Sequence, residues 1–154
     1  MFLSSLVQYL FVTSELVSYA SEMPLTRLPL ISGRSKNESK VVGSAAQAFN
    51  VPGIGDNIPG WISGHLTLPP RGIKDAEGVG LCSQVFFVGE CQPNSIEFSL
   101  ADPEENKFDA ATAQRFLLSK GDFFHVPPNN VYRTENHSRT TECKLYWTII
   151  RPIS

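Results

Sequence analysis

The chain has 154 residues, of which 42% are apolar and 18% charged, a composition typical of a folded protein with room for one domain of ordinary size. From residue 49 onward, nine Lys and Arg stand against twelve Asp and Glu, a balance of −3. Because nucleic-acid affinity depends on basic residues that release counterions from phosphate, this composition excludes a general DNA binder. Three cysteines without a CxxC pair indicate reduced thiols in a cytosolic or nuclear protein.

Residues 1–48 read as an N-terminal extension. Its first 20 residues are apolar with leucines at roughly helical spacing, but Gln8 and Glu15 interrupt the run. This pattern predicts a marginal amphipathic helix, too short and too polar to span a membrane. Residues 21–48 are rich in Ser, Pro and Gly and carry a small basic cluster at 34–40, which is typical of a linker. We expect no membrane contact.

From residue 49 to 154 the sequence changes to short apolar runs separated by Gly, Pro, Asn and Asp. In SIEFSLA at 95–101, apolar and polar residues alternate, which predicts a strand with Ile, Phe and Leu inward and Glu and Ser outward. Only one helical turn is expected, at 109–114, so the pattern predicts an all-β sandwich or barrel. The expected strands are 61–70, 82–90, 95–101, 114–119, 122–128, 130–136 and 143–150.

The stretch GDFFHVPPNNVYRTENHS at 121–138 predicts a strand, a turn and a second strand. Pro127 ends the first strand because it has no N–H to donate, and Asn129 tolerates a left-handed conformation. The spacing of Gly121, Pro127, Asn129, Tyr132 and Asn136 resembles the second conserved motif of the RmlC-like cupin superfamily. The resemblance implies a jelly-roll β-barrel in which Tyr132 occupies the position of a metal-binding histidine.

The same resemblance implies that the metal ligands of a cupin are missing. The strand at 80–92, where the family carries two His and a Glu, has no His, and a neutral phenol is a rare metal ligand. His65, His125 and His137 include no pair with ligand spacing. We therefore expect no metal, no cofactor, no catalytic residues and no enzyme activity. The alternative is a metal-free cupin that binds a small ligand or acts as a sugar isomerase or epimerase, with His65 or His125 as general base.

A narrower resemblance rests on four elements in order: LPPRGIK at 68–74, QVFFV at 84–88, the turn at 121–138 and KLYWTIIRP at 144–152. Together they resemble the carboxy-terminal cupin domain of the centromere protein C family, in its fungal form, over residues from about 60 to 152. The resemblance implies a non-enzymatic homodimer that recruits other kinetochore proteins and serves kinetochore assembly and chromosome segregation in the nucleus, at the centromere. The family's Trp-containing nucleosome-binding motif is not found in this sequence, so contact with centromeric nucleosomes or DNA would be indirect or made by another segment.

Two apolar runs, VFFV at 85–88 and YWTII at 146–150, are continuous. Such runs are typical of strands that are covered on both faces, because a strand with one wet face alternates. A second copy of the chain is the simplest cover, and residues 1–58 folded back over the same face are the alternative. The residues expected near the two-fold contact are Phe86, Val88, Tyr146 and Thr148.

The interior of the barrel, without a metal, is expected to be either a filled core or an open groove for a peptide or small ligand. Aromatic side chains with a polar tip favour interfaces, so Tyr and His would supply the polar contacts of an open groove. The residues expected to line the interior are Phe124, His125, Tyr132 and Trp147.

Overall fold

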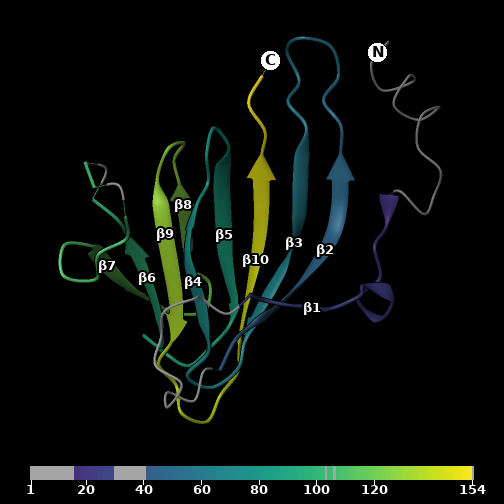
Figure 1. Ribbon diagram of the computed structural model, residues 1–154. Coiled ribbons are helices and arrows are strands. Elements are labelled where there is room, and N and C mark those ends of the chain that lie inside the picture. Colours follow the sequence, from purple (N-terminus) through teal and green to yellow (C-terminus); the bar gives the residue numbers. More distant parts are fainter. Residues whose placement is uncertain (1–15, 30–40, 103, 106, 154) are drawn as a thin grey trace.

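The computed structural model describes residues 16–29, 41–102, 104–105 and 107–153, and its strands form two antiparallel sheets that face each other (Figure 1). The first sheet has the order β1 (Thr26–Arg27), β2 (Ser44–Val51), β3 (Trp61–Leu68), β10 (Cys143–Ile150), β5 (Ser83–Glu90), β8 (Phe123–Val126). The second has the order β4 (Ile73–Gly78), β9 (Val131–Asn136), β6 (Ile96–Leu100), β7 (Gln114–Leu118). A short 3-10 helix, η1 (Ala20–Glu22), precedes β1. The expected all-β jelly roll is confirmed.

Seven of these ten strands lie where the sequence predicts a strand, whereas β1, β2 and β4 lie where it predicts none. The sequences of β2 and β4, SAAQAFNV and IKDAEG, carry little alternating apolar signal. Both are held by pairing instead, β2 with β3 and β4 with β9. Since β2 begins at Ser44, the expected boundary at residue 49 falls inside a strand, and the sheet begins earlier than the sequence indicates.

The expected short elements outside the strands have different outcomes. At 109–114 the chain makes a single turn, in which Ala113 N–H donates to Asp109 O at 2.9 Å. Most of the expected helix at 1–20 and the basic cluster at 34–40 lie outside the described residues. Among the residues that are described, no helix has the length and apolar character needed to cross a membrane.

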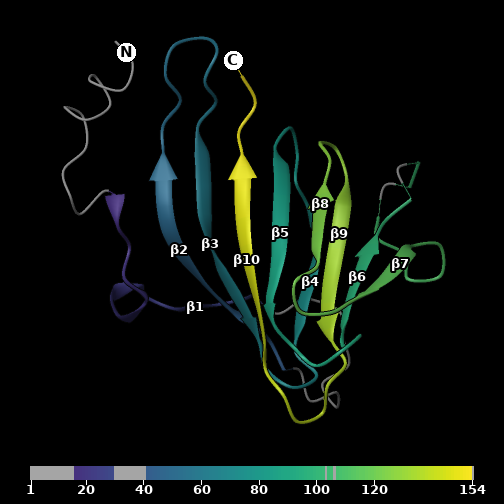
Figure 2. The same cartoon turned by 180° about the vertical axis from the view of Figure 1, so that it is seen from behind.

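The hydrophobic core lies between the two sheets. β10 runs in the middle of the six-stranded sheet with β3 on one side and β5 on the other, as Figure 2 shows from behind. One face of these strands packs against the second sheet, and the other face, here called the outer face, turns away from it. The buried side chains of the core are Leu66, Leu68, Phe86, Val88, Ile96, Phe98, Val126, Tyr132, Cys143 and Leu145.

Candidate functional site

The turn between β8 and β9 has the backbone that its sequence predicts. Pro127 follows the last residue of β8, and Asn129 has a φ of +65°, in the left-handed region that Asn tolerates better than most residues. Asn129 N–H donates to Gly80 O at 2.6 Å. The turn is thereby tied to the loop that joins β4 to β5.

Asn136, the last residue of the turn motif, is also the last residue of β9 and therefore lies at the opposite end of the fold from the turn. Its side chain is fully buried. The amide nitrogen Nδ2 lies 3.2 Å from Leu68 O, 3.1 Å from Pro69 O and 2.9 Å from Thr141 O, and Oδ1 accepts from Ser138 N–H at 3.0 Å. Asn136 therefore joins the end of β3 to the loop before β10, a structural role.

Tyr132 is packed among aromatic rings. Its side chain is 1% exposed, and its ring centroid lies 5.4 Å from that of Phe86 and 6.2 Å from that of Phe98. Phe124 stacks on both phenylalanines, with centroid distances of 4.5 Å to Phe86 and 4.0 Å to Phe98. Burial raises the pKa of the Tyr132 hydroxyl above its ordinary value. The phenol is therefore neutral at physiological pH.

The side chains that face the interior do not fit a transition metal. On β5 the inward-facing residues are Gln84, Phe86 and Val88, and on β9 the corresponding position is Tyr132. A metal centre needs three or four converging nitrogen, sulfur or carboxylate donors, whereas these four residues offer one amide and one neutral phenol. Stacked aromatic rings occupy this part of the interior, which favours the filled core over the open groove.

Of the residues expected to line the interior, His125 and Trp147 point to different faces of the six-stranded sheet. His125 is exposed on the outer face, paired with Val85 of β5. Adjacent residues of a strand point to opposite faces, so His125 points outward because Phe124 points inward, and the expectation that His125 lines the interior is wrong. Trp147 packs against the core and covers Gly64, where an added Cβ would lie 2.6 Å from the indole.

The outer face carries a row of four ring side chains, one from each of four neighbouring strands. His65 of β3 is paired with Tyr146 of β10, Tyr146 with Phe87 of β5, and Phe87 with Phe123 of β8. Their ring centroids are 6.3, 6.4 and 4.7 Å apart in that order. We call these four residues the aromatic row. Phe123 is 69% and Tyr146 44% exposed, so the row presents aromatic surface to the solvent.

The residues expected at a two-fold contact do not all lie on one face of the six-stranded sheet. Phe86 and Val88 are 1% and 0% exposed and belong to the core, so they are not available to a partner. Their neighbours Val85 and Phe87 face outward in their place, because the side chains of β5 alternate. Tyr146 lies on the outer face as expected.

A hollow of about 310 Å³ adjoins the aromatic row. His65 lines it and is 9% exposed, and its Nδ1 is buried without a hydrogen-bond partner. Burial, and secondly the charge of Lys144, lower the pKa of this imidazole, which favours the neutral form. An unpaired buried polar atom is costly, so Nδ1 of His65 is a locally unfavourable feature beside the hollow. Other residues around it are Met23, Val85, Phe123 and Thr148.

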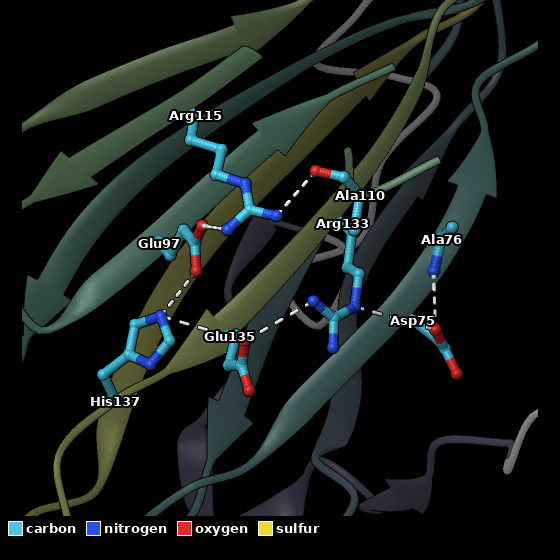
Figure 3. A network of polar contacts seen from close by, with 8 residues as sticks. All are labelled: Asp75, Ala76, Glu97, Ala110, Arg115, Arg133, Glu135 and His137. Atoms are coloured by element: carbon cyan, nitrogen blue, oxygen red, sulfur yellow. Dashed lines mark hydrogen bonds and ion pairs between the residues drawn. The ribbon is translucent and has the colours of Figure 1, made fainter. Parts of the chain in front are cut away.

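A polar network covers the opposite side of the molecule, on the face of the four-stranded sheet that turns away from the core (Figure 3). Glu97 of β6 and Glu135 of β9 are directly opposite each other in the register, and His137 follows β9. None of these three residues is among the site residues expected from the sequence. The Glu-x-His spacing of 135 and 137 was the available signal, because residues two apart lie on the same face of a strand.

No family model matches the chain, and no curated protein sequence matches it. Solved structures of the cupin fold do match: a cupin domain from Bordetella pertussis has 15% identity and a TM-score of 0.52, covering 75% of this chain and 100% of that one. A predicted oxalate decarboxylase from Thermotoga maritima has 13% identity and a TM-score of 0.54, covering 88% and 99%. At such identities the likeness establishes the fold alone, and this fold is a cupin jelly roll.

The structural neighbours also include the protein family that the sequence resembles. Drosophila melanogaster CENP-C, solved bound to CAL1, has 12% identity and a TM-score of 0.51, covering 96% of this chain and 94% of that one. CENP-C and a predicted oxalate decarboxylase thus share this fold, and the side chains of the individual site have to distinguish between such functions.

Proposed function

We propose that this chain is a non-enzymatic scaffold domain of the CENP-C type, which forms a homodimer through the outer face of its six-stranded sheet. The observation that carries the proposal is the exposed aromatic row. Contiguous apolar patches of this kind on a soluble protein are typical of interaction sites, and aromatic residues are enriched in such sites. The interior supports the non-enzymatic half of the proposal, since aromatic rings occupy the place of the metal ligands.

A second copy of the chain fits the shape of this surface. The aromatic row runs from β3 to the edge strand β8, and a two-fold axis would place the row of one subunit against that of the other. A stable dimer of standard size buries about 800 Å² per subunit.

The N-terminal extension covers this surface only in part. Met23 lines the hollow, which accords with the alternative that residues 1–58 fold back over the sheet. Phe123 and Tyr146 nevertheless keep 69% and 44% exposure with residues 16–29 in place. The described part of the extension therefore leaves most of the row free for a partner.

We place the protein in the nucleus, at centromeres, as a component of kinetochore assembly. The likeness to CENP-C supports this placement, and the structure of CENP-C with CAL1 is an example of a domain of this fold that binds another protein. The balance of −3 from residue 49 onward gives little affinity for phosphate. Contact with centromeric DNA is therefore indirect or made by another segment, and the direct partners are proteins.

The alternative functions, sugar isomerase and small-ligand binder, receive less support from the side chains. An isomerase of this fold would need its general base inside the barrel, whereas His65 and His125 both lie on the outer face. Metal analysis of the purified protein, with anomalous diffraction to locate any ion, tests the choice, because a stoichiometric transition metal bound inside the barrel would contradict the proposal.

Sedimentation equilibrium of the full chain tests the dimer. We expect the wild type to be dimeric and the double variant Phe123→Glu, Tyr146→Glu to be monomeric, with a dissociation constant at least roughly a hundredfold higher, because buried aromatic anchors contribute about 2 kcal/mol each. Leu117→Glu is the matched control: Leu117 is 59% exposed but lies on β7 of the other sheet. A wild-type monomer at high concentration, or equal loss in the control, would refute the interface.

Localisation of a fluorescently tagged protein tests the cellular half of the proposal. We expect centromeric foci through mitosis in the wild type and weaker foci in the double variant, because a monomer loses the avidity of two linked copies. Diffuse fluorescence in cells whose wild-type protein is dimeric would remove the kinetochore assignment and leave the dimer intact.

A further inference from the structure

Three potential metal ligands converge on the outside of the four-stranded sheet, far from the barrel interior. They are the carboxylates of Glu97 and Glu135 and the imidazole of His137, and one donor atom from each lies within 4.8 Å of the other two. His137 Nε2 is 2.5 Å from Glu97 Oε2 and 3.8 Å from Glu135 Oε2. Figure 3 shows the imidazole nitrogen directed at both carboxylates.

The fold fixes these three groups from rigid elements. Glu97 and Glu135 are directly opposite each other on the paired strands β6 and β9, and His137 N–H donates to Ser95 O at 2.8 Å, so the backbone beside the imidazole is also held. Sites on sheet strands keep a geometry better than sites on loops. Metal binding would thus cost little ordering of the chain.

Neighbouring groups orient both carboxylates. Arg115 pairs with Oε1 of Glu97 at 3.3 Å, the oxygen that does not face His137, and its other nitrogen donates to Ala110 O at 2.6 Å. Arg133 lies between Glu135, at 3.4 Å, and Asp75, at 3.9 Å. Such partners of the ligands are typical of metal sites, where they fix the orientation of the donors.

The arrangement of charge favours a cation. Like charges directly opposite on paired strands destabilise a sheet, and here one of the two carboxylates, that of Glu97, is only 8% exposed. The three carboxylates of the network, those of Asp75, Glu97 and Glu135, outnumber the two guanidinium groups by one when His137 is neutral. The half-exposed imidazole of His137 leaves an open side through which an ion and its water ligands can enter.

We propose that Glu97, Glu135 and His137 bind a divalent transition-metal ion of the zinc type. One imidazole nitrogen and two carboxylate oxygens form a donor set that suits Zn²⁺ or Co²⁺, at distances of about 2.0–2.2 Å. Small rotations of the side chains bring donors within 4.8 Å of one another around one such ion. This site lies on the other sheet from the aromatic row, so it does not depend on the proposed dimer.

The competing description is an ion-pair network without an ion, in which His137 itself bridges the two carboxylates. The two descriptions differ in one measurable respect. A metal site binds one ion per chain and loses it when the imidazole is removed, whereas an ion-pair network binds none.

Isothermal titration calorimetry of the full chain with ZnCl₂ tests the proposal, together with Co²⁺ absorption spectra. We expect one Zn²⁺ per chain and a Co²⁺ spectrum without thiolate-to-metal charge transfer, which separates this site from the three cysteines. His137→Ala should weaken binding by roughly tenfold or more, as should the isosteric variant Glu135→Gln. His125→Ala is the control, because His125 is exposed on the outer face of the other sheet, and it should bind as the wild type does.

Three outcomes would overturn the metal site: no binding to the wild type at millimolar Zn²⁺, undiminished binding by both His137→Ala and Glu135→Gln, or a Co²⁺ spectrum dominated by thiolate. Thermal unfolding of each variant without metal shows whether it is folded. If His137→Ala alone fails to fold, the folded Glu135→Gln variant decides the question.

Discussion

Replacing Asn136 with Ala should destabilise the domain strongly, although the residue contacts neither the aromatic row nor the polar network. The amide is fully buried, and its removal leaves the carbonyls of Leu68, Pro69 and Thr141 and the N–H of Ser138 without this partner. At a net value of about 1 kcal/mol for each lost hydrogen bond, and with Nδ2 shared among three acceptors, we expect a loss of about 2–4 kcal/mol in the free energy of unfolding. The melting temperature should fall by roughly 8–16 °C.

Asn130→Ala is the matched control for this change. Nδ2 of Asn130 also faces two carbonyl oxygens, those of Pro127 at 3.3 Å and Pro128 at 3.1 Å. These carbonyls belong to a turn that water reaches, so the loss should stay below about 1 kcal/mol. Urea unfolding followed by circular dichroism measures both variants, and equal midpoints would refute the role assigned to Asn136.

Asn136→Asp separates the two ends of the amide. The substitution keeps an acceptor for Ser138 N–H but places a carboxylate oxygen against three carbonyl oxygens in place of the Nδ2 donor. We expect a loss of stability at neutral pH at least as large as that of Asn136→Ala. An Asp variant as stable as the wild type would show that the donor side contributes nothing.

Three further predictions follow from burial. Folding lowers the pKa of His65, so the folded protein binds fewer protons at this imidazole than the unfolded chain does. The free energy of unfolding should therefore have its full value above pH ~6.5 and decrease as the pH drops below that value. Melting temperatures between pH 5 and 8 should decrease less in His65→Gln than in the wild type. Tyr132→Trp should overpack the filled interior and cost about 1–3 kcal/mol in urea unfolding, whereas an open groove would accept it. Burial raises the pKa of the Cys143 thiol to about 11. Iodoacetamide at pH 8 should therefore alkylate the partly exposed Cys82 faster than Cys143, and equal alkylation rates of the two thiols would contradict this prediction.

The sequence predicts the class of fold and the turn between β8 and β9 because both depend on local signals. Alternation in 95–101 and the Pro and Asn residues at 127–130 act within a few residues of chain. The missed strands β2 and β4 have small or polar residues instead. They form because β3 and β9 offer backbone hydrogen-bonding edges with which they pair. Such pairing depends on the assembled sheet, so the local sequence of β2 and β4 does not predict it.

Strand parity in the sequence predicts more of the two candidate sites than the expected site residues include. The parity of adjacent strand residues already excludes Phe124 and His125 from sharing a face. The same parity places Glu135 and His137 together. The approach of Glu97 to this pair could not be predicted, because it depends on the register of β6 against β9, which joins residues 38 positions apart.

The sequence by itself determined that this is an all-β chain with a Pro-Pro-Asn-Asn turn between two of its strands. Tertiary structure alone decided which side of β5 faces the core, putting Phe86 inside and Phe87 in the aromatic row. The physical reason is that VFFV is apolar on both faces. Alternation in a sequence can choose the buried face of a strand only when the other face is polar; when both are apolar, packing against the second sheet makes the choice.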